Sequence, residues 1–129
     1  MKKLKVLLLS GCLGFSLQAS AGIAIIGNAN LSLDSLSTKD AKAIFLCDRK
    51  YLADGQKVVF AYQAEGSAVR KEFNKSILAM KPTSIKRHWS KIKFTGACDQ
   101  PKILEDDEAV RAWVKSTPGA IGYIDASHV

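Results

Sequence analysis

The alternation of short β-prone runs with helix-periodic segments is the feature that most limits the folds open to this chain. Three apolar or β-branched runs, too short for helices and bounded by turn residues, read as strands: "GIAIIGN" at 22–28, "KVVFAYQ" at 57–63 and "AIGYI" at 120–124. Between them, apolar residues recur at helical spacing in four segments, 41–46, 68–80, 85–94 and 105–115. The order β, α, β, α, α, α, β predicts an α/β domain with a small, mainly parallel sheet flanked by helices.

Start and stop signals accompany these predicted helices. Ser37 and Asp40 resemble a capping box before the first helix. Pro82 is expected to stop the second helix, and Ser84 to cap the third. The acidic start of the fourth, Asp106 to Glu108, suits the helix dipole. We therefore assign these carboxylates no further role at this point.

The N-terminal segment has the pattern of a secretory signal peptide. Residues 1–21 carry three lysines, an apolar run from Val6 to Leu17 and the small-residue ending Ala19-Ser20-Ala21. We expect export to the periplasm and a mature domain of residues 22–129, long enough for one core and one lobe. An alternative is a lipobox ending at Cys12, but the apolar run continues beyond that cysteine to the cleavage site.

The charge of the chain narrows the class of partner. The formal net charge is +7, and removal of residues 1–21 would lower it by three. This basic excess favours an anionic small molecule, a membrane surface or an acidic partner, while export argues against a nucleic-acid role. A solvated basic surface with no particular partner is the alternative. The oligomeric state cannot be predicted from these features.

Two cysteines, Cys47 and Cys98, remain once the leader is removed. An even pair in a chain bound for an oxidising compartment predicts a disulfide, worth roughly 4 kcal/mol for a loop of about 50 residues. The alternative is a pair of buried thiols. The two histidines, His88 and His128, lie at no ligand-like spacing from either cysteine, so we expect no metal site and no cofactor.

Catalytic signals are weak. Nucleophilic catalysis needs a serine or cysteine near a base, and the histidines fall in a lysine-rich helix and at the chain end. His88 is interpreted as an exposed helix residue. The sequence has no GxxxxGK[ST], HExxH or CxxC motif. We therefore expect a protein that is not an enzyme.

The turn between the second predicted strand and the helix after it is the candidate site. Gly66 and Ser67 stand where the strand ends, and Arg70 follows within the first helical turn. A glycine, a hydroxyl and a cation at a helix N-terminus are suited to holding an oxyanion. The alternatives are that Ser67 is only a helix cap and that Arg70 points into solvent.

Several of these segments resemble the second half of periplasmic phosphate-binding proteins of ABC transporters, which have the type II periplasmic-binding fold. The resemblance is carried by "LSTKDAKAIFLCDRKYLADGQKVVFAYQAEGSAVRKEF", by "HWSKIKFTG" and, most specifically, by "TPGAIGY" at 117–123. It implies a single short lobe of that fold. It also implies phosphate or a similar oxyanion as the ligand, and a membrane transporter or another envelope protein as the partner.

Transferring the family's phosphate-binding turn to this chain gives a mixed result. Anchored on Gly66 and Ser67, the family's arginine falls on Gln63, its next glycine on Ala68 and its threonine on Val69. Only the serine is retained as a side-chain contact.

The resemblance leaves Arg70 as the nearby cation that would replace the missing arginine. Asn28, after the first predicted strand, is a candidate for further donors, because ligands of open α/β sheets bind at the carboxyl ends of strands. The alternative there is a plain polar turn. Two functions therefore stay open: a solute-binding module, or an envelope interaction subunit that keeps the lobe fold and binds no ligand.

Overall fold

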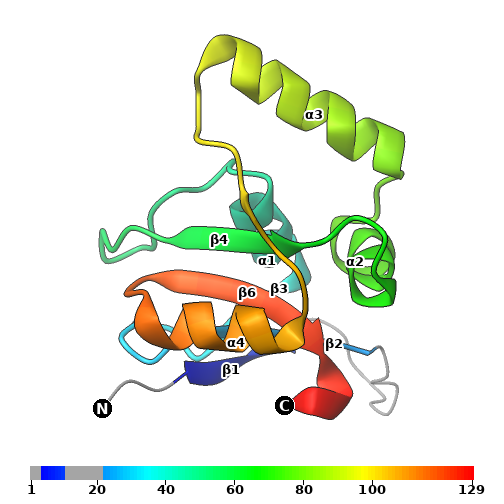
Figure 1. Ribbon diagram of the computed structural model, residues 1–129. Coiled ribbons are helices and arrows are strands. Elements are labelled where there is room, and N and C mark those ends of the chain that lie inside the picture. The colour runs from blue at the N-terminus through cyan, green and yellow to red at the C-terminus, as the bar shows by residue number, and fades with distance from the viewer. Residues whose placement is uncertain (1–3, 11–21) are drawn as a thin grey trace.

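The computed structural model describes residues 4–10 and 22–129 as one layered α/β domain (Figure 1). A mixed sheet has the strand order β3-β1-β2-β6-β4-β5. The strands are β1 (Leu4–Ser10), β2 (Ile23–Asn28), β3 (Ser35–Ser37), β4 (Val59–Gln63), β5 (Lys102–Leu104) and β6 (Ala120–Asp125). The helices are α1 (Thr38–Phe45), α2 (Ala68–Phe73), α3 (Pro82–Thr95) and α4 (Asp107–Ser116), with a π-helical turn η2 (Asn74–Leu78) and a 3-10 turn η3 (Ala126–His128).

The sheet confirms the predicted fold class. Strand β4 runs parallel to β6 and β5, and β1 runs parallel to β3, whereas β2 is antiparallel to both of its neighbours. The predicted order appears as β2, α1, β4, α2, α3, α4, β6. Because β4 and β6 are parallel, their carboxyl ends lie at the same end of the strands of the sheet. The carboxyl end of the antiparallel β2 lies at the opposite end.

Strand β1 falls inside the predicted signal peptide. It pairs with β2 and β3, and Lys5 Nζ donates hydrogen bonds to the carbonyl oxygens of Leu31 (2.7 Å) and Leu33 (2.9 Å). Cleavage after Ala21 would remove this strand and leave β2 at the edge of the sheet. The predicted cleavage site and Cys12 lie outside the described residues, so the processing of the chain stays a prediction.

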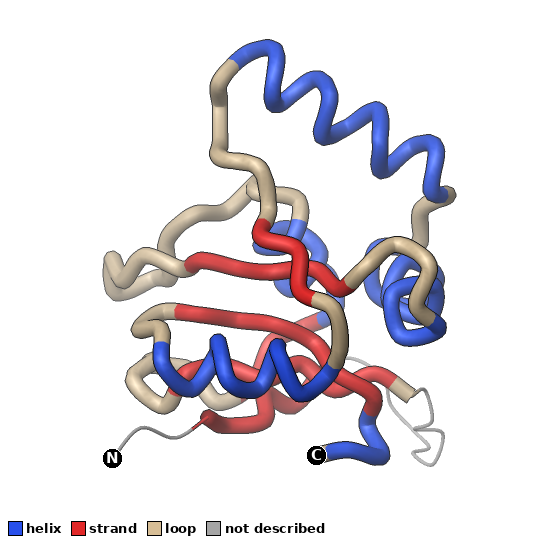
Figure 2. Tube along the Cα trace, in the orientation of Figure 1, coloured by secondary structure: helices blue, strands red, loops and turns tan. Residues whose placement is uncertain are grey.

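Two layers of helices cover the sheet (Figure 2). On one face, α1, α2 and α3 bury a cluster of aromatic rings, in which Phe73 stacks on Tyr123 with ring centroids 3.8 Å apart. On the other face, α4 packs Val110 and Val114 against β2 and β6. A Cβ atom at Gly122 would lie 2.7 Å from Val110 Cγ1, so this glycine allows α4 to approach the sheet closely.

The helix boundaries confirm one predicted cap and correct another. Ser37 caps α1, since its Oγ accepts a hydrogen bond from the Asp40 amide at 3.0 Å. Helix α3 begins at Pro82, with Lys81 as its N-cap, so the expected cap at Ser84 is wrong. Proline suits the first helical position because its fixed φ matches the helix and its missing N–H has no intrahelical acceptor there.

The predicted disulfide is present between Cys47 and Cys98. It joins the residues just after α1 to the loop that follows α3, and it therefore fixes the C-terminal end of α3 to the body of the domain. None of the helices in the described ranges has the length and apolar character needed to cross a membrane.

Candidate functional site

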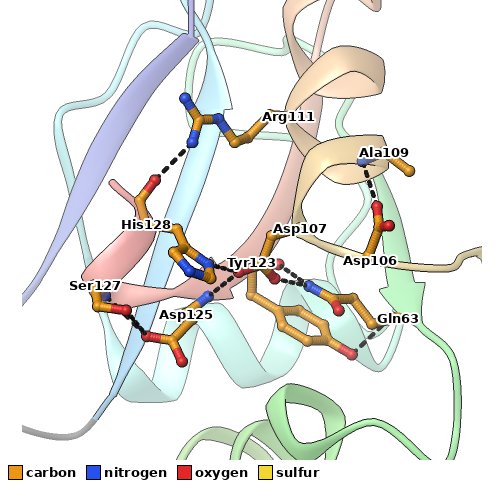
Figure 3. Close-up of polar contacts among 9 residues, drawn as sticks. All are labelled: Gln63, Asp106, Asp107, Ala109, Arg111, Tyr123, Asp125, Ser127 and His128. Atoms are coloured by element: carbon orange, nitrogen blue, oxygen red, sulfur yellow. Dashed lines mark hydrogen bonds and ion pairs between the residues drawn. The ribbon is translucent and has the colours of Figure 1, made fainter.

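Two helix N-termini meet beside the carboxyl ends of β4 and β6. Helix α2 starts after Ser67, and α4 starts after Asp106. Residues from both starts line one pocket of about 490 Å³. Its lining consists of Gln63, Ser67, Val69, Glu105, Asp106, Asp107, Glu108, Arg111 and His128. Figure 3 shows the polar contacts on the α4 side of this pocket.

Ser67 is the N-cap of α2, as one of the two sequence interpretations proposed. Its Oγ accepts a hydrogen bond from the Arg70 amide at 3.0 Å, and its own amide donates to Ala64 O at 3.0 Å. The amides of Ala68 and Val69, at the first two helical positions, have no acceptor within the helix. Gly66 is exposed just before them. Of this helix start, Ser67 and Val69 line the pocket.

Arg70 is part of the protein interior. Its side chain is buried, with Nη1 donating to Gln63 O at 2.9 Å and Nε to Asn74 Oδ1 at 3.1 Å. The guanidinium also lies over the Tyr62 ring, 4.7 Å from its centroid. The interpretation of Arg70 as a solvated residue is therefore wrong. Arg70 lines a different pocket, between α3 and β5, and not the one beside Ser67.

Gln63, which the resemblance places at the position of the phosphate-binding arginine, is also buried and hydrogen-bonded to its neighbours. Its Nε2 donates to Asp107 Oδ1 at 2.6 Å and to Tyr123 O at 3.1 Å. Its backbone amide donates to the Tyr123 hydroxyl at 2.8 Å, and burial raises the pKa of that phenol. Gln63 thus ties the end of β4 to the start of α4.

Asp107 is the centre of the polar network in Figure 3. Besides Gln63, it accepts a hydrogen bond from the Asp125 amide at 3.1 Å, and its Oδ2 lies 2.6 Å from His128 Nδ1. The hydrogen bond to Asp107 is the main reason that the pKa of His128 is raised above 6.5. Arg111 Nη1 donates to His128 O at 2.7 Å. The network therefore holds η3 against α4.

Three residues of this network were not predicted as site residues from the sequence: Asp107, Arg111 and His128. Asp107 and Arg111 are four residues apart and face the same side of a helix, which is a usable signal for a shared site. The contact of His128 with Asp107 had no local signal, because the two are 21 residues apart and meet only through β6.

The pocket has an excess of carboxylates on its α4 side. Glu105, Asp106, Asp107 and Glu108 line it together with the cationic Arg111. The Asp106 Oδ1 accepts a hydrogen bond from the Ala109 amide at 2.9 Å and so caps α4. Across the described ranges, no group of three or more acidic, histidine or cysteine side chains is arranged to hold a metal ion. The pocket thus combines amide donors on one side with acceptors on the other.

Asn28 does not join this pocket. Its Nδ2 donates to Val114 O at 2.8 Å and Lys115 O at 3.2 Å, and its Oδ1 accepts from the Asn30 amide at 2.9 Å. It therefore caps the C-terminus of α4. The expectation that Asn28 adds donors beside Ser67 assumed that β2 is parallel to its neighbours. Instead, β2 is antiparallel to β6, so its carboxyl end lies at the opposite end of the sheet from Ser67.

Comparison with known proteins gives the fold. No family model matches the chain, and no curated protein matches it. Among solved structures it is similar to a protein from Clostridium perfringens, described as a phosphate ABC transporter substrate-binding protein and crystallised with bound phosphate. The TM-score is 0.66 over 98% of this chain, with 18% sequence identity.

The chain has the fold of a periplasmic-binding-protein lobe. This lobe spans about half of the length of the Clostridium perfringens protein, 51% of that chain. At 18% identity the likeness establishes the fold alone, and the ligand of this lobe has to be argued from its own residues.

Proposed function

We propose that the protein is an exported solute-binding module, and that the pocket between the starts of α2 and α4 binds a small oxyanion that retains a proton, such as hydrogenphosphate. One observation carries the proposal: amide donors at the start of α2 and carboxylates at the start of α4 line the same pocket. The phosphate bound to the structurally similar protein supports the choice of anion.

In this proposal, the α2 side supplies the donors. The free donors are the amides of Ala68 and Val69 together with the positive end of the helix dipole, and Ser67 and Val69 of this helix start line the pocket. Helix α2 continues directly into η2, and the two together span the eleven residues Ala68–Leu78. Arg111, rather than Arg70, is the arginine that lines the pocket. A guanidinium has five N–H donors, and because His128 O takes only one of them, the others remain for the anion. Arg70 takes the role of a support behind the pocket wall, and Gln63 is a support within that wall.

The carboxylates on the α4 side decide which oxyanion is accepted. A carboxylate accepts hydrogen bonds and repels a fully ionised anion, whereas it gains a hydrogen bond from an anion with an O–H group. Phosphate retains a proton near neutral pH, and sulfate does not. The pocket is therefore expected to favour phosphate over sulfate, with Asp106 or Glu105 as the acceptor.

A single lobe covers its ligand from one side only. Enclosure of most of the ligand is what gives small-molecule sites high affinity. We therefore expect binding in the millimolar range, worth about 4 kcal/mol, unless a partner closes over the pocket. A membrane transporter or another envelope protein is the proposed partner.

The test is the thermal stability of the purified protein in rising concentrations of sodium phosphate, with sodium sulfate at matched ionic strength. Binding to the folded state raises the melting temperature in proportion to RT ln(1 + [L]/Kd). Phosphate should raise it and sulfate should not. Ser67→Ala and Arg111→Gln should reduce the phosphate effect, whereas Lys71→Gln, exposed on α2 outside the pocket, should leave it unchanged.

A second function is favoured by a specific observation: the Gln63 and Arg70 side chains are committed to internal hydrogen bonds. Equal responses of the wild type and the pocket variants to phosphate and sulfate would exclude the oxyanion site. The protein would then be the envelope interaction subunit, which keeps the lobe fold without a ligand.

Export is part of this proposal and has its own test. We expect the intact mass of the exported protein to correspond to a chain that starts at Gly22 and contains the Cys47–Cys98 disulfide. A diacylated species that starts at Cys12 would place the protein on a membrane by a lipid anchor. A mass that corresponds to the uncleaved chain would show that β1 is a permanent strand of the sheet.

A further inference from the structure

Helix α3 carries a cluster of exposed cations around one exposed aromatic ring. We call the set Lys86, Arg87, Lys91, Lys93 and Phe94 the basic face of α3. All five residues are exposed, and Phe94 is the most exposed large hydrophobic side chain of the described residues, at 91%. The helix has no acidic residue along its fourteen positions. It is also the outermost helix of the molecule in Figure 1.

Helical spacing places the ring between the cations. Arg87, Lys91 and Phe94 follow one another at intervals of four and three residues and share one stripe of the helix. Lys86 and Lys93 are seven residues apart on the neighbouring stripe. Phe94 therefore has cations on both sides, and its own side chain points away from the domain.

These cations are not used to hold the fold. The three ion pairs among the described residues join Lys5 to Asp34, Arg49 to Asp40 and His128 to Asp107, and none involves α3. The acidic start of α4 lies on the far side of β4 from α3 (Figure 1). The charge of the basic face is thus available to a partner.

The opposite side of α3 contacts the domain. Ile85, Trp89 and Ile92 are buried, and His88 Nε2 lies 2.8 Å from Leu46 O. The Cys47–Cys98 disulfide holds the loop just after the helix. The basic face is therefore the side of α3 that points away from the domain.

We infer that the basic face of α3 docks onto a membrane surface of anionic lipids. At such a surface, a layer of negative phosphates lies directly above an apolar interior, and the basic face has the matching arrangement of cations around a protruding ring. Lysine and arginine are attracted to anionic headgroups, and an aromatic ring is favoured at the interface. An acidic protein would match the cations but would need a pocket for Phe94. This inference does not depend on oxyanion binding at Ser67.

The experiment is sedimentation of the purified protein with vesicles of phosphatidylcholine alone or with added phosphatidylglycerol. The exported protein is used, with its N-terminus defined by intact mass and identical in all variants. Two variants change the basic face: Phe94→Ala, and Arg87→Gln combined with Lys91→Gln. Two matched controls lie elsewhere: Tyr51→Ala, which removes another exposed ring, and Lys71→Gln combined with Lys75→Gln.

The expected result is binding only to the anionic vesicles, weakened by salt because the charges are exposed. The double charge variant should lower the partition coefficient by about 10- to 30-fold, and Phe94→Ala by about fivefold. Both controls should bind like the wild type. The inference is overturned if wild type ignores anionic vesicles, if the controls lose binding equally, or if Phe94→Ala binds unchanged. Binding to polyglutamate but not to vesicles would likewise overturn it in favour of an acidic protein partner.

Discussion

The starts of α2 and α4 face the same pocket but satisfy their free amides in different ways. α2 is capped by the Ser67 hydroxyl, has no acidic residue in its first turn, and leaves the amides of Ala68 and Val69 without an intrahelical acceptor. α4 is capped by the Asp106 carboxylate and has Asp107 and Glu108 in its first turn. The start of α2 can therefore still attract an anion, whereas the start of α4 already has its own carboxylates.

In the proposed function, this difference gives the two sides of the pocket separate tasks. A lone helix start would accept any small oxyanion. With carboxylates opposite, we propose that the proton on the oxyanion becomes part of its recognition. The supports behind each start differ as well: Arg70 holds α2 from inside the aromatic cluster, whereas Asp107 holds α4 through Gln63, Asp125 and His128.

The largest expected effect comes from Arg70→Gln, which tests whether this residue belongs to the core or to the pocket. The variant loses charge-assisted hydrogen bonds to Gln63 O and Asn74 Oδ1, and we expect the free energy of unfolding to fall by about 3 kcal/mol. Urea denaturation measures it, with the exposed Lys71→Gln as control. Unchanged stability combined with a lost phosphate response would make Arg70 a ligand residue.

Asp107→Asn tests the support of α4. The amide cannot accept all three hydrogen bonds of the carboxylate, so we expect a loss of about 2 kcal/mol in the free energy of unfolding. Glu108→Gln, an exposed neighbour on the same turn, should change it by less than about 0.5 kcal/mol. Equal changes of the free energy of unfolding in the two variants would mean that Asp107 stabilises the fold only through its charge and not through its hydrogen bonds.

The two caps provide the direct comparison. Ser67→Ala and Asp106→Ala each remove one side-chain acceptor from a helix start, and each should lower the free energy of unfolding by about 1 kcal/mol without phosphate. Their phosphate responses should differ: Ser67→Ala should weaken the thermal shift. Asp106→Ala should change how the thermal shift depends on the protonation of phosphate, because the variant loses an acceptor for the phosphate proton. Identical phosphate responses would refute the separate tasks of the two sides.

The smallest expected effect is a pH dependence that arises from His128. Its pKa in the folded protein is raised above 6.5, chiefly by the hydrogen bond to Asp107. A raised folded-state pKa adds stability that is fully present below pH 6.5 and is lost as the pH rises through the folded pKa. The melting temperature of His128→Gln should show less of this decline. A wild-type decline that is unchanged in the variant would assign it to other groups.

Much of the architecture could be predicted from local sequence signals, and the failures have physical causes. The three longer strands within residues 22–129, the Ser37 cap and the disulfide were predicted correctly because periodicity, capping chemistry and cysteine number are local or countable features. β3 and β5 were missed because strands of three residues have too few positions to show a pattern. Pro82 was interpreted as a stop although it starts α3, since proline serves both roles.

The site was harder to predict than the fold. The N-cap role of Ser67 was predicted from its turn. The direction of Arg70 was not, because it depends on Tyr62 and Asn74, which offer it a partner only in the folded chain. The contact between Gln63 and Asp107 joins residues 44 positions apart, and no local pattern indicates it. Asn28 was misplaced because the direction of β2 depends on its neighbours in the sheet.

The most direct test of the central claim is an NMR titration of the exported protein, labelled with ¹⁵N, with phosphate and then with sulfate at the same ionic strength. We predict that the backbone amide signals of Ala68 and Val69 shift saturably with phosphate and only weakly with sulfate, together with the Arg111 side-chain signal. The amides at the start of α4 should move less, because Asp106 already accepts from Ala109. Phosphate shifts that appear only at the lysines of α3, or equal shifts with both anions, would contradict the proposal.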